Sequence, residues 1–228
     1  MTIVLLTAPK GKLALKLVEK KGSYQYKSSV ISIVYDSILW AIEPLHSIVE
    51  TQLLGYNAGQ QSGDVVIALK NLILSILNSF DAGQSLDTVH KSILDFISKI
   101  HGLEIFLAPS ALLLSHITIL QEGLDAVHAD DLPSENEILA DPRAGATLSL
   151  SGKIYHLTRA FLFHQAEGAA LHIDISGAVA EHYHQVNPDI LIGNLFEGLA
   201  SFQLARQSDG KESAKWIERG LSALTKIR

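Results

Sequence analysis

Residues 64–100 read DVVIALKNLILSILNSFDAGQSLDTVHKSILDFISKI, and this stretch indicates the fold. Apolar residues recur at helical spacing after Asp64, whose carboxylate suits an N-cap because it can accept from the free N–H groups of a first turn. The run Asp81–Gly83 predicts a helix stop. Ser85 then caps a second amphipathic helix, so the stretch predicts two antiparallel helices joined by about four residues.

Residues 189–227 repeat this pattern loosely, as DILIGNLFEGLASFQLARQSDGKESAKWIERGLSALTKI. Asp189 stands where Asp64 stands, and Gly193 stands where Ala68 stands. A close crossing of two helices needs a small side chain at such a position. Self-similarity of this length is typical of stacked helical hairpins, which usually form binding surfaces or scaffolds. We therefore expect an all-α fold, an α-solenoid of stacked antiparallel helical hairpins.

The composition excludes several classes of protein. The 228 residues are 47% hydrophobic, which is ample for a core, and the net charge of -6 offers no basic surface for nucleic acid. The chain has no cysteine, which excludes disulfides and thiolate metal sites and fits a cytoplasmic protein. The longest apolar runs, residues 69–77 and 105–114, fall short of the roughly 20 residues that a membrane span needs.

The pattern divides the chain into four segments. Residues 1–28 are uncertain, because their first apolar residues fit a short strand or a frayed helix. Residues 29–127 predict a first array of helical hairpins. Residues 128–147 are acidic and contain prolines, which predicts an exposed loop that either holds a short helix at 134–139 or separates two helical halves. Residues 148–228 predict a second array, with helices at 148–165, 168–186, 188–207 and 211–228.

The stretch from Trp40 to Ala68 contains the motifs Trp40-x-x-Glu43-Pro44-Leu45, Glu50, Gly55-Tyr56-x-Ala58-Gly59, Ser62-Gly63-Asp64 and Ala68. These motifs resemble the TPR-like helical region that follows the AAA or STAND-type ATPase module in large multidomain signalling proteins of algae and other protists. Phe196–Ala200 is similar to the F-x-x-GLA helix of that region, and Tyr155–Phe163 is similar to the helix before it.

This resemblance covers roughly residues 29–228. It implies a TPR-like α-solenoid that serves as a docking or relay region. It also implies that nucleotide binding and kinase or cyclase chemistry belong to other domains, so that an ATPase or kinase domain on another segment or chain is an expected partner.

No motif for catalysis accompanies these helices. The chain lacks the P-loop GxxxxGK[ST], a kinase catalytic loop and the G-x-S-x-G elbow of hydrolases. The spacing of Gly55, Gly59 and Gly63 could suggest a phosphate-binding loop, but no strand precedes them and no lysine follows in place. We interpret them as close-crossing positions and a helix stop, and we expect a protein that is not an enzyme and holds no cofactor.

A metal site is the alternative interpretation. Glu43 with His46, and Glu181 with His184, form two Glu-x-x-His elements. On two helices of a bundle, such elements and two further glutamates form the di-metal site of ferritin-like proteins. Pro44 weakens this interpretation, because it would break the helix that must present the first pair.

The favoured interpretation is a protein-interaction or relay scaffold for a protein or peptide partner. In solenoids of this type the first helix of each hairpin lines the binding groove. The polar residues on those helices that we expect to contact the partner are Asn71, Asn78, Gln203 and Arg206.

Overall fold

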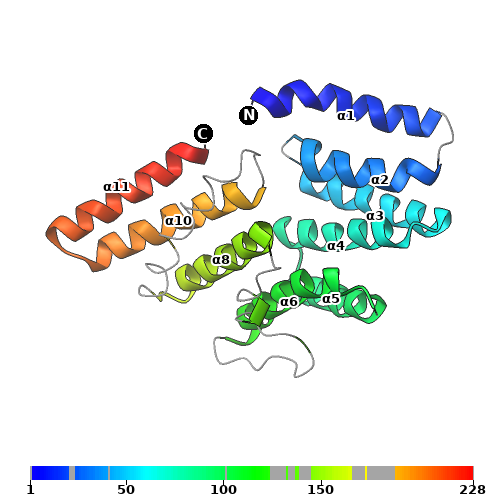
Figure 1. Ribbon diagram of the computed structural model, residues 1–228. Helices are drawn as coiled ribbons and strands as arrows, with labels where there is room; N and C mark the ends of the chain where they lie inside the picture. Colours follow the sequence, from blue (N-terminus) through cyan, green and yellow to red (C-terminus); the bar gives the residue numbers. More distant parts are fainter. Residues whose placement is uncertain are drawn as a thin grey trace. The chain divides into compact units, whose positions relative to one another are not determined.

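The protein is described by a computed structural model in which every regular element is a helix (Figure 1). This confirms the all-α prediction for the part of the chain that the structure describes. None of the helices there is both long enough and apolar enough to cross a membrane. The described residues are 2–20, 24–40, 42–100, 102–123, 132, 137–138, 145–165, 173 and 188–227.

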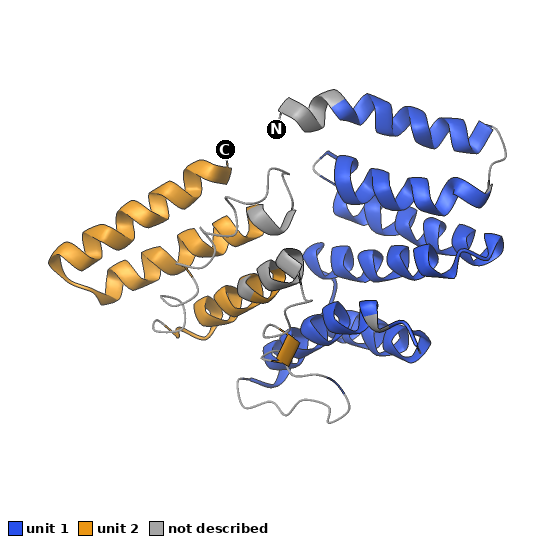
Figure 2. Ribbon diagram, in the orientation of Figure 1, with its two compact units in different colours: residues 1–132 blue, residues 133–228 orange. Residues whose placement is uncertain are grey.

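The chain forms two compact units, Met1–Leu132 and Pro133–Arg228 (Figure 2). The boundary falls inside the acidic segment 128–147 that the sequence separates from its two helical arrays. Most of this segment lies outside the described residues. Its last residues, from Gly145, already belong to a helix, and Ile138 is buried rather than exposed.

In unit 1 each helix packs on the next one along the chain, from α1 to α6. The first apolar residues, which fit either a short strand or a helix in the sequence, belong to a helix, because α1 includes them and continues through Pro9. A turn of π-helix, η1, continues the second helix. The elements of unit 1 are α1 Thr2–Lys20, α2 Tyr24–Val34, η1 Tyr35–Leu39, α3 Leu45–Ser62, α4 Val65–Asp81, α5 Leu86–Lys99, η2 Glu104–Phe106 and α6 Leu107–Glu122.

The ends of α4 and α5 follow from local chemistry. The Asp64 carboxylate accepts from the backbone N–H of Ile67 at 3.4 Å, and the Ser85 hydroxyl caps α5 in the same way through Thr88 at 3.4 Å. Gly63 ends α3 with φ 79°, a left-handed conformation that glycine adopts without strain. These limits agree with the predicted ones, yet α4 packs more extensively on α3 than on α5.

Two glycines let α2, α3 and α4 approach one another closely. A Cβ added at Gly59 would lie 2.7 Å from the Ser28 hydroxyl of α2 and 2.8 Å from the Ala68 Cβ of α4. A Cβ added at Gly55 would lie 2.8 Å from the side chain of Asn71. Real contacts of this kind are longer, so both positions exclude any larger residue. This confirms the interpretation of these glycines as close-crossing positions.

Unit 2 contains α8 Gly145–Leu162, α10 Pro188–Gln207 and α11 Gly210–Ile227. Helix α10 packs on both α8 and α11. The core of this unit is a cluster of buried residues from all three helices, to which Ile173 also belongs. The members of the cluster are Leu157, Ala160, Ile173, Ala200, Leu204, Ala205 and Trp216.

In unit 2 the start of α10 differs from the predicted cap. Asp189 is not the cap that the repeat predicts, because α10 begins at Pro188 and Asp189 lies inside its first turn. Proline suits a first helical position, since its missing N–H has no partner there in any case. The predicted helix at 168–186 lies outside the described residues, with the exception of Ile173.

Candidate functional site

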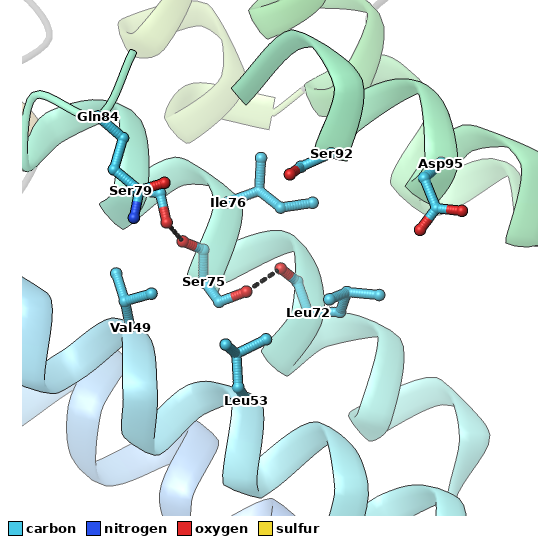
Figure 3. Close-up of a pocket in the computed structure, with 9 residues that line it drawn as sticks. All are labelled: Val49, Leu53, Leu72, Ser75, Ile76, Ser79, Gln84, Ser92 and Asp95. Carbon is cyan, nitrogen blue, oxygen red and sulfur yellow. Dashed lines mark hydrogen bonds between the residues drawn. The ribbon is translucent and has the colours of Figure 1, made fainter. Parts of the chain in front are cut away.

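A groove of about 220 Å³ opens between α3, α4 and α5 of unit 1 (Figure 3). We call it the α3–α4–α5 groove. Helix α3 contributes two aliphatic side chains, α4 contributes four residues, and the turn after α4 and helix α5 contribute the rest. The lining residues are Val49, Leu53, Leu72, Ser75, Ile76, Ser79, Gln84, Ser92 and Asp95.

The groove exists because the three helices pack unequally. Helix α4 lies close to α3 through Ala68 and the glycines, whereas α5 makes a less extensive contact with α4. The face of α4 between them carries Ser75 and Ser79, whose small side chains leave space between the two flanking helices. The closely packed helices α3 and α4 and the less extensively packed α5 therefore enclose a hollow, which is lined in part by the short side chains of Ser75 and Ser79.

The groove has a buried floor and an exposed rim. Val49, Ser75, Ile76 and Ser79 are at most 9% exposed and form the floor. Leu53 is 39% exposed although it lines the groove. An apolar side chain that is still accessible beside a preformed hollow is available to bury against a ligand.

The hydroxyl groups of the three groove serines donate hydrogen bonds to backbone carbonyls. Ser75 Oγ donates to the carbonyl of Leu72 at 2.7 Å, and Ser79 Oγ donates to the carbonyl of Ser75 at 2.7 Å (Figure 3). Ser92 Oγ donates in the same way to the carbonyl of Thr88 at 2.9 Å. A hydroxyl has one hydrogen and two lone pairs, so these three groups can offer a ligand only acceptor oxygens.

Asp95 supplies the one ionisable side chain of the lining. Its Oδ2 accepts from the ammonium of Lys99, one turn further along α5, at 2.5 Å. This hydrogen bond raises the pKa of Lys99 above its ordinary value, with the charge of Asp95 adding a smaller effect. The pair is exposed on both sides, so it contributes little to the free energy of unfolding.

The structure corrects the prediction for Asn71. Its side chain is fully buried, and Nδ2 donates to the Ser28 carbonyl at 3.0 Å and to the Ser28 hydroxyl at 3.1 Å. Asn71 therefore ties α4 to α2 and is closed to a partner. Asn78 is half-buried and donates to Gln52 Oε1 of α3 at 3.0 Å. Neither amide belongs to the lining of the groove.

In unit 2, Gln203 and Arg206 lie on α10 and keep some access to solvent. Gln203 is half-buried, and its Nε2 lies 2.7 Å from Nδ1 of His164. Arg206 is exposed in the last turn of the helix. Their role as partner contacts stays a prediction. Because they belong to the other unit, they are not part of the α3–α4–α5 groove.

The Phe196–Ala200 motif has a structural role in unit 2. Phe196 stacks edge-on against Phe161 of α8, with ring centroids 6.1 Å apart. Glu197 is buried and accepts from Arg219 Nε of α11 at 2.8 Å, while Arg219 also donates to the carbonyl of Ile173 at 2.8 Å. The motif thus joins the neighbouring helices of the unit to α10.

The metal alternative finds no support in the residues that the structure describes. Glu43 precedes α3, Pro44 is the N-cap of that helix, and Glu43 binds Lys12 at 2.7 Å. His46 is exposed on the first turn of the helix. No group of three acidic or histidine side chains in the described part of the chain could hold a metal ion. The second element, Glu181 and His184, lies outside the described residues.

The sequence interpretation missed the groove residues. Leu53, Leu72 and Ile76 have the spacing of ordinary core residues, and nothing local distinguishes them. The available signal is the pair Ser75 and Ser79, one turn apart on an otherwise apolar face, where small polar side chains indicate a hollow. Comparison of the chain with models of protein families, with curated proteins and with solved structures found no match.

Proposed function

We propose that this chain is a non-catalytic protein-interaction module that binds a segment of a partner protein in the α3–α4–α5 groove. The observation that carries the proposal is the groove itself, with accessible Leu53 on its rim. Its volume of about 220 Å³ is below the roughly 300–1,000 Å³ of sites for small ligands and cofactors. A hollow of this size suits one or two side chains of a peptide.

The arrangement of unit 1 supports a solenoid of TPR-like hairpins as the framework for this function. Each helix from α1 to α6 packs on its neighbour in the chain, as in arrays whose repeats contact only the next repeat. The small residues Gly59 and Ala68 at the α3–α4 crossing suit close hairpin packing. The resemblance to signalling-ATPase helical regions favours a docking or relay role, with an ATPase or kinase domain as the source of the partner segment.

Peptide selection on the intact chain tests this function. A phage-displayed library of random 12-residue peptides is selected on the protein, and the tightest peptide is synthesised and titrated by fluorescence anisotropy. Burying a leucine contributes about 1.5–3 kcal/mol, so Leu53→Ala should weaken binding by about tenfold. Leu54→Ala is the matched control, because Leu54 is the next residue of α3, is 56% exposed and does not line the groove.

The control should bind the peptide within about twofold of the unaltered chain, since it removes the same side-chain atoms from the same helix outside the groove. Far-UV circular dichroism of both variants verifies that α3 is folded. If the selected peptides bind the Leu53→Ala chain as tightly as the control, the groove is not the binding site and the proposal is wrong.

A further inference from the structure

The polar lining of the α3–α4–α5 groove consists almost entirely of hydrogen-bond acceptors. The hydroxyls of Ser75, Ser79 and Ser92 donate to backbone carbonyls of their own helices, so only their oxygens are available. The Asp95 carboxylate accepts a hydrogen bond from Lys99. Gln84 alone among these side chains can donate to a ligand. The complementary ligand is one that brings donors and positive charge.

The rest of the lining is aliphatic. Val49 and Leu53 of α3 face Leu72 and Ile76 of α4, with the Ser92 hydroxyl and the Asp95 carboxylate on the α5 side (Figure 3). A ligand that fits both parts has an apolar stem and a cationic head. Lysine and arginine have this form, because their methylene chains cover apolar surface while the charged group stays at the edge.

We propose that the partner segment places a lysine or arginine side chain in this groove, with its stem on the aliphatic wall and its charge against Asp95. This inference rests on the proposed function and specifies the chemistry of the partner. The Asp95 carboxylate has two oxygens, and Lys99 binds Oδ2. Because the ion pair with Lys99 is exposed and weak, a second cation can share or displace it.

The same lining disfavours an acidic or phosphorylated segment. Such a segment would bring further acceptors and negative charge to three hydroxyls that have no hydrogen to give and to the Asp95 carboxylate. Like charges placed together at an interface oppose binding and select against the wrong partner. Specificity for a basic segment therefore follows from repulsion as well as from attraction.

A charge-removal cycle tests the inference. The tightest peptide of the 12-residue library is compared with an analogue in which arginine is replaced by citrulline or lysine by norleucine, which keeps the carbon stem and removes the charge. On the unaltered chain the neutral analogue should bind about five- to tenfold more weakly. On the Asp95→Asn chain the two peptides should bind within about twofold of each other, because the charge that distinguishes them is gone.

Asp87→Asn is the matched control. Asp87 lies on the same helix, but its Oδ1 accepts from Gln121 Nε2 of α6 at 2.6 Å and it does not line the groove. The control chain should retain the full difference between the charged and the neutral peptide, which assigns the effect to the position of Asp95 rather than to net charge.

The outcomes separate this inference from the proposed function. Peptides that are lost with Leu53→Ala, but whose neutral analogue binds equally well, would overturn the basic-segment inference and leave the groove as the binding site. Selected groove peptides that contain no lysine or arginine, or that are acidic, would overturn it in the same way. Peptides unaffected by Leu53→Ala would overturn both.

Discussion

Replacing Gly59 with alanine should destabilise unit 1, although alanine is the better helix former. The added Cβ would lie 2.8 Å from the Ala68 Cβ, 3.0 Å from the Ala68 Cα and 2.7 Å from the Ser28 Oγ. Ordinary carbon contacts begin near ~3.5 Å, so the methyl group is about 0.7 Å too close to α4. Ala68 has no rotamer to change and one of its atoms is backbone, so the helices themselves must move apart.

The expected magnitude follows from two opposing effects. Overpacking a close contact costs about 1–3 kcal/mol, and the absence of a flexible neighbour favours the upper half of that range. Replacing a helical glycine with alanine contributes about 1 kcal/mol in the other direction. We therefore expect a net loss of about 1–2 kcal/mol. Native-state hydrogen exchange of the α3 and α4 amides measures this loss locally, which avoids assuming that the two units unfold together.

Gly198→Ala is the matched control for this measurement. A Cβ at Gly198, in the interior of α10, would meet nothing closer than the Gly220 carbonyl oxygen at 3.6 Å, an ordinary contact. The same substitution should therefore stabilise the α10 amides by about 0.5–1 kcal/mol. If Gly59→Ala leaves the protection of α3 and α4 unchanged or increases it, the close approach of α2, α3 and α4 is refuted.

Two further predictions concern single contacts. Arg219→Met should lower the free energy of unfolding of unit 2 by about 3 kcal/mol, because it removes the Arg219 guanidinium from the buried Glu197 carboxylate. Urea unfolding measures this loss, and adding Glu197→Gln should recover part of it. A change below about 1 kcal/mol would contradict the importance of this pair. Asp64→Ala should lower the protection of the Ile67 amide against hydrogen exchange by about 1 kcal/mol. Asp64→Asn should not lower it, because asparagine caps a helix equally well. Equal protection in both variants would contradict the capping role.

The features of the fold that depend only on residues adjacent in the sequence could be predicted from it. Asp64 and Ser85 mark the starts of α4 and α5, because an N-cap acts within one turn. The same reasoning failed at Asp189. An aspartate suits the first turn as well as the cap, and the adjacent Pro188 takes the first helical position. The residue types alone do not distinguish these two placements.

The role of Asn71 could not be predicted, because it depends on a distant glycine. From the sequence alone, an amide side chain in the middle of an apolar helix is interpreted as an exposed residue that contacts a partner. It is buried here because Gly55 lacks a side chain, which allows Asn71 to pass α3 and donate to Ser28 on α2. The hydrogen bond spans 43 positions along the chain and is a property of the packed helices. Local periodicity contains no information about it.

The groove also depends on packing between residues that are far apart in the sequence. Its lining residues belong to three elements, and whether they enclose a space depends on how closely α5 approaches α4. Gly55 and Gly59 do not line the groove. They set the distance between α3, which carries Val49 and Leu53, and α4, which carries Ile76. Helices α3 and α4 are in close contact at these glycines. Helix α5, which packs less extensively on α4, carries Asp95, the charged side chain of the lining. The spacing of Gly55, Gly59 and Gly63 could suggest a loop that binds a phosphate. In the structure Gly55 and Gly59 instead help to position a groove whose polar groups are acceptors, which suit a cationic side chain.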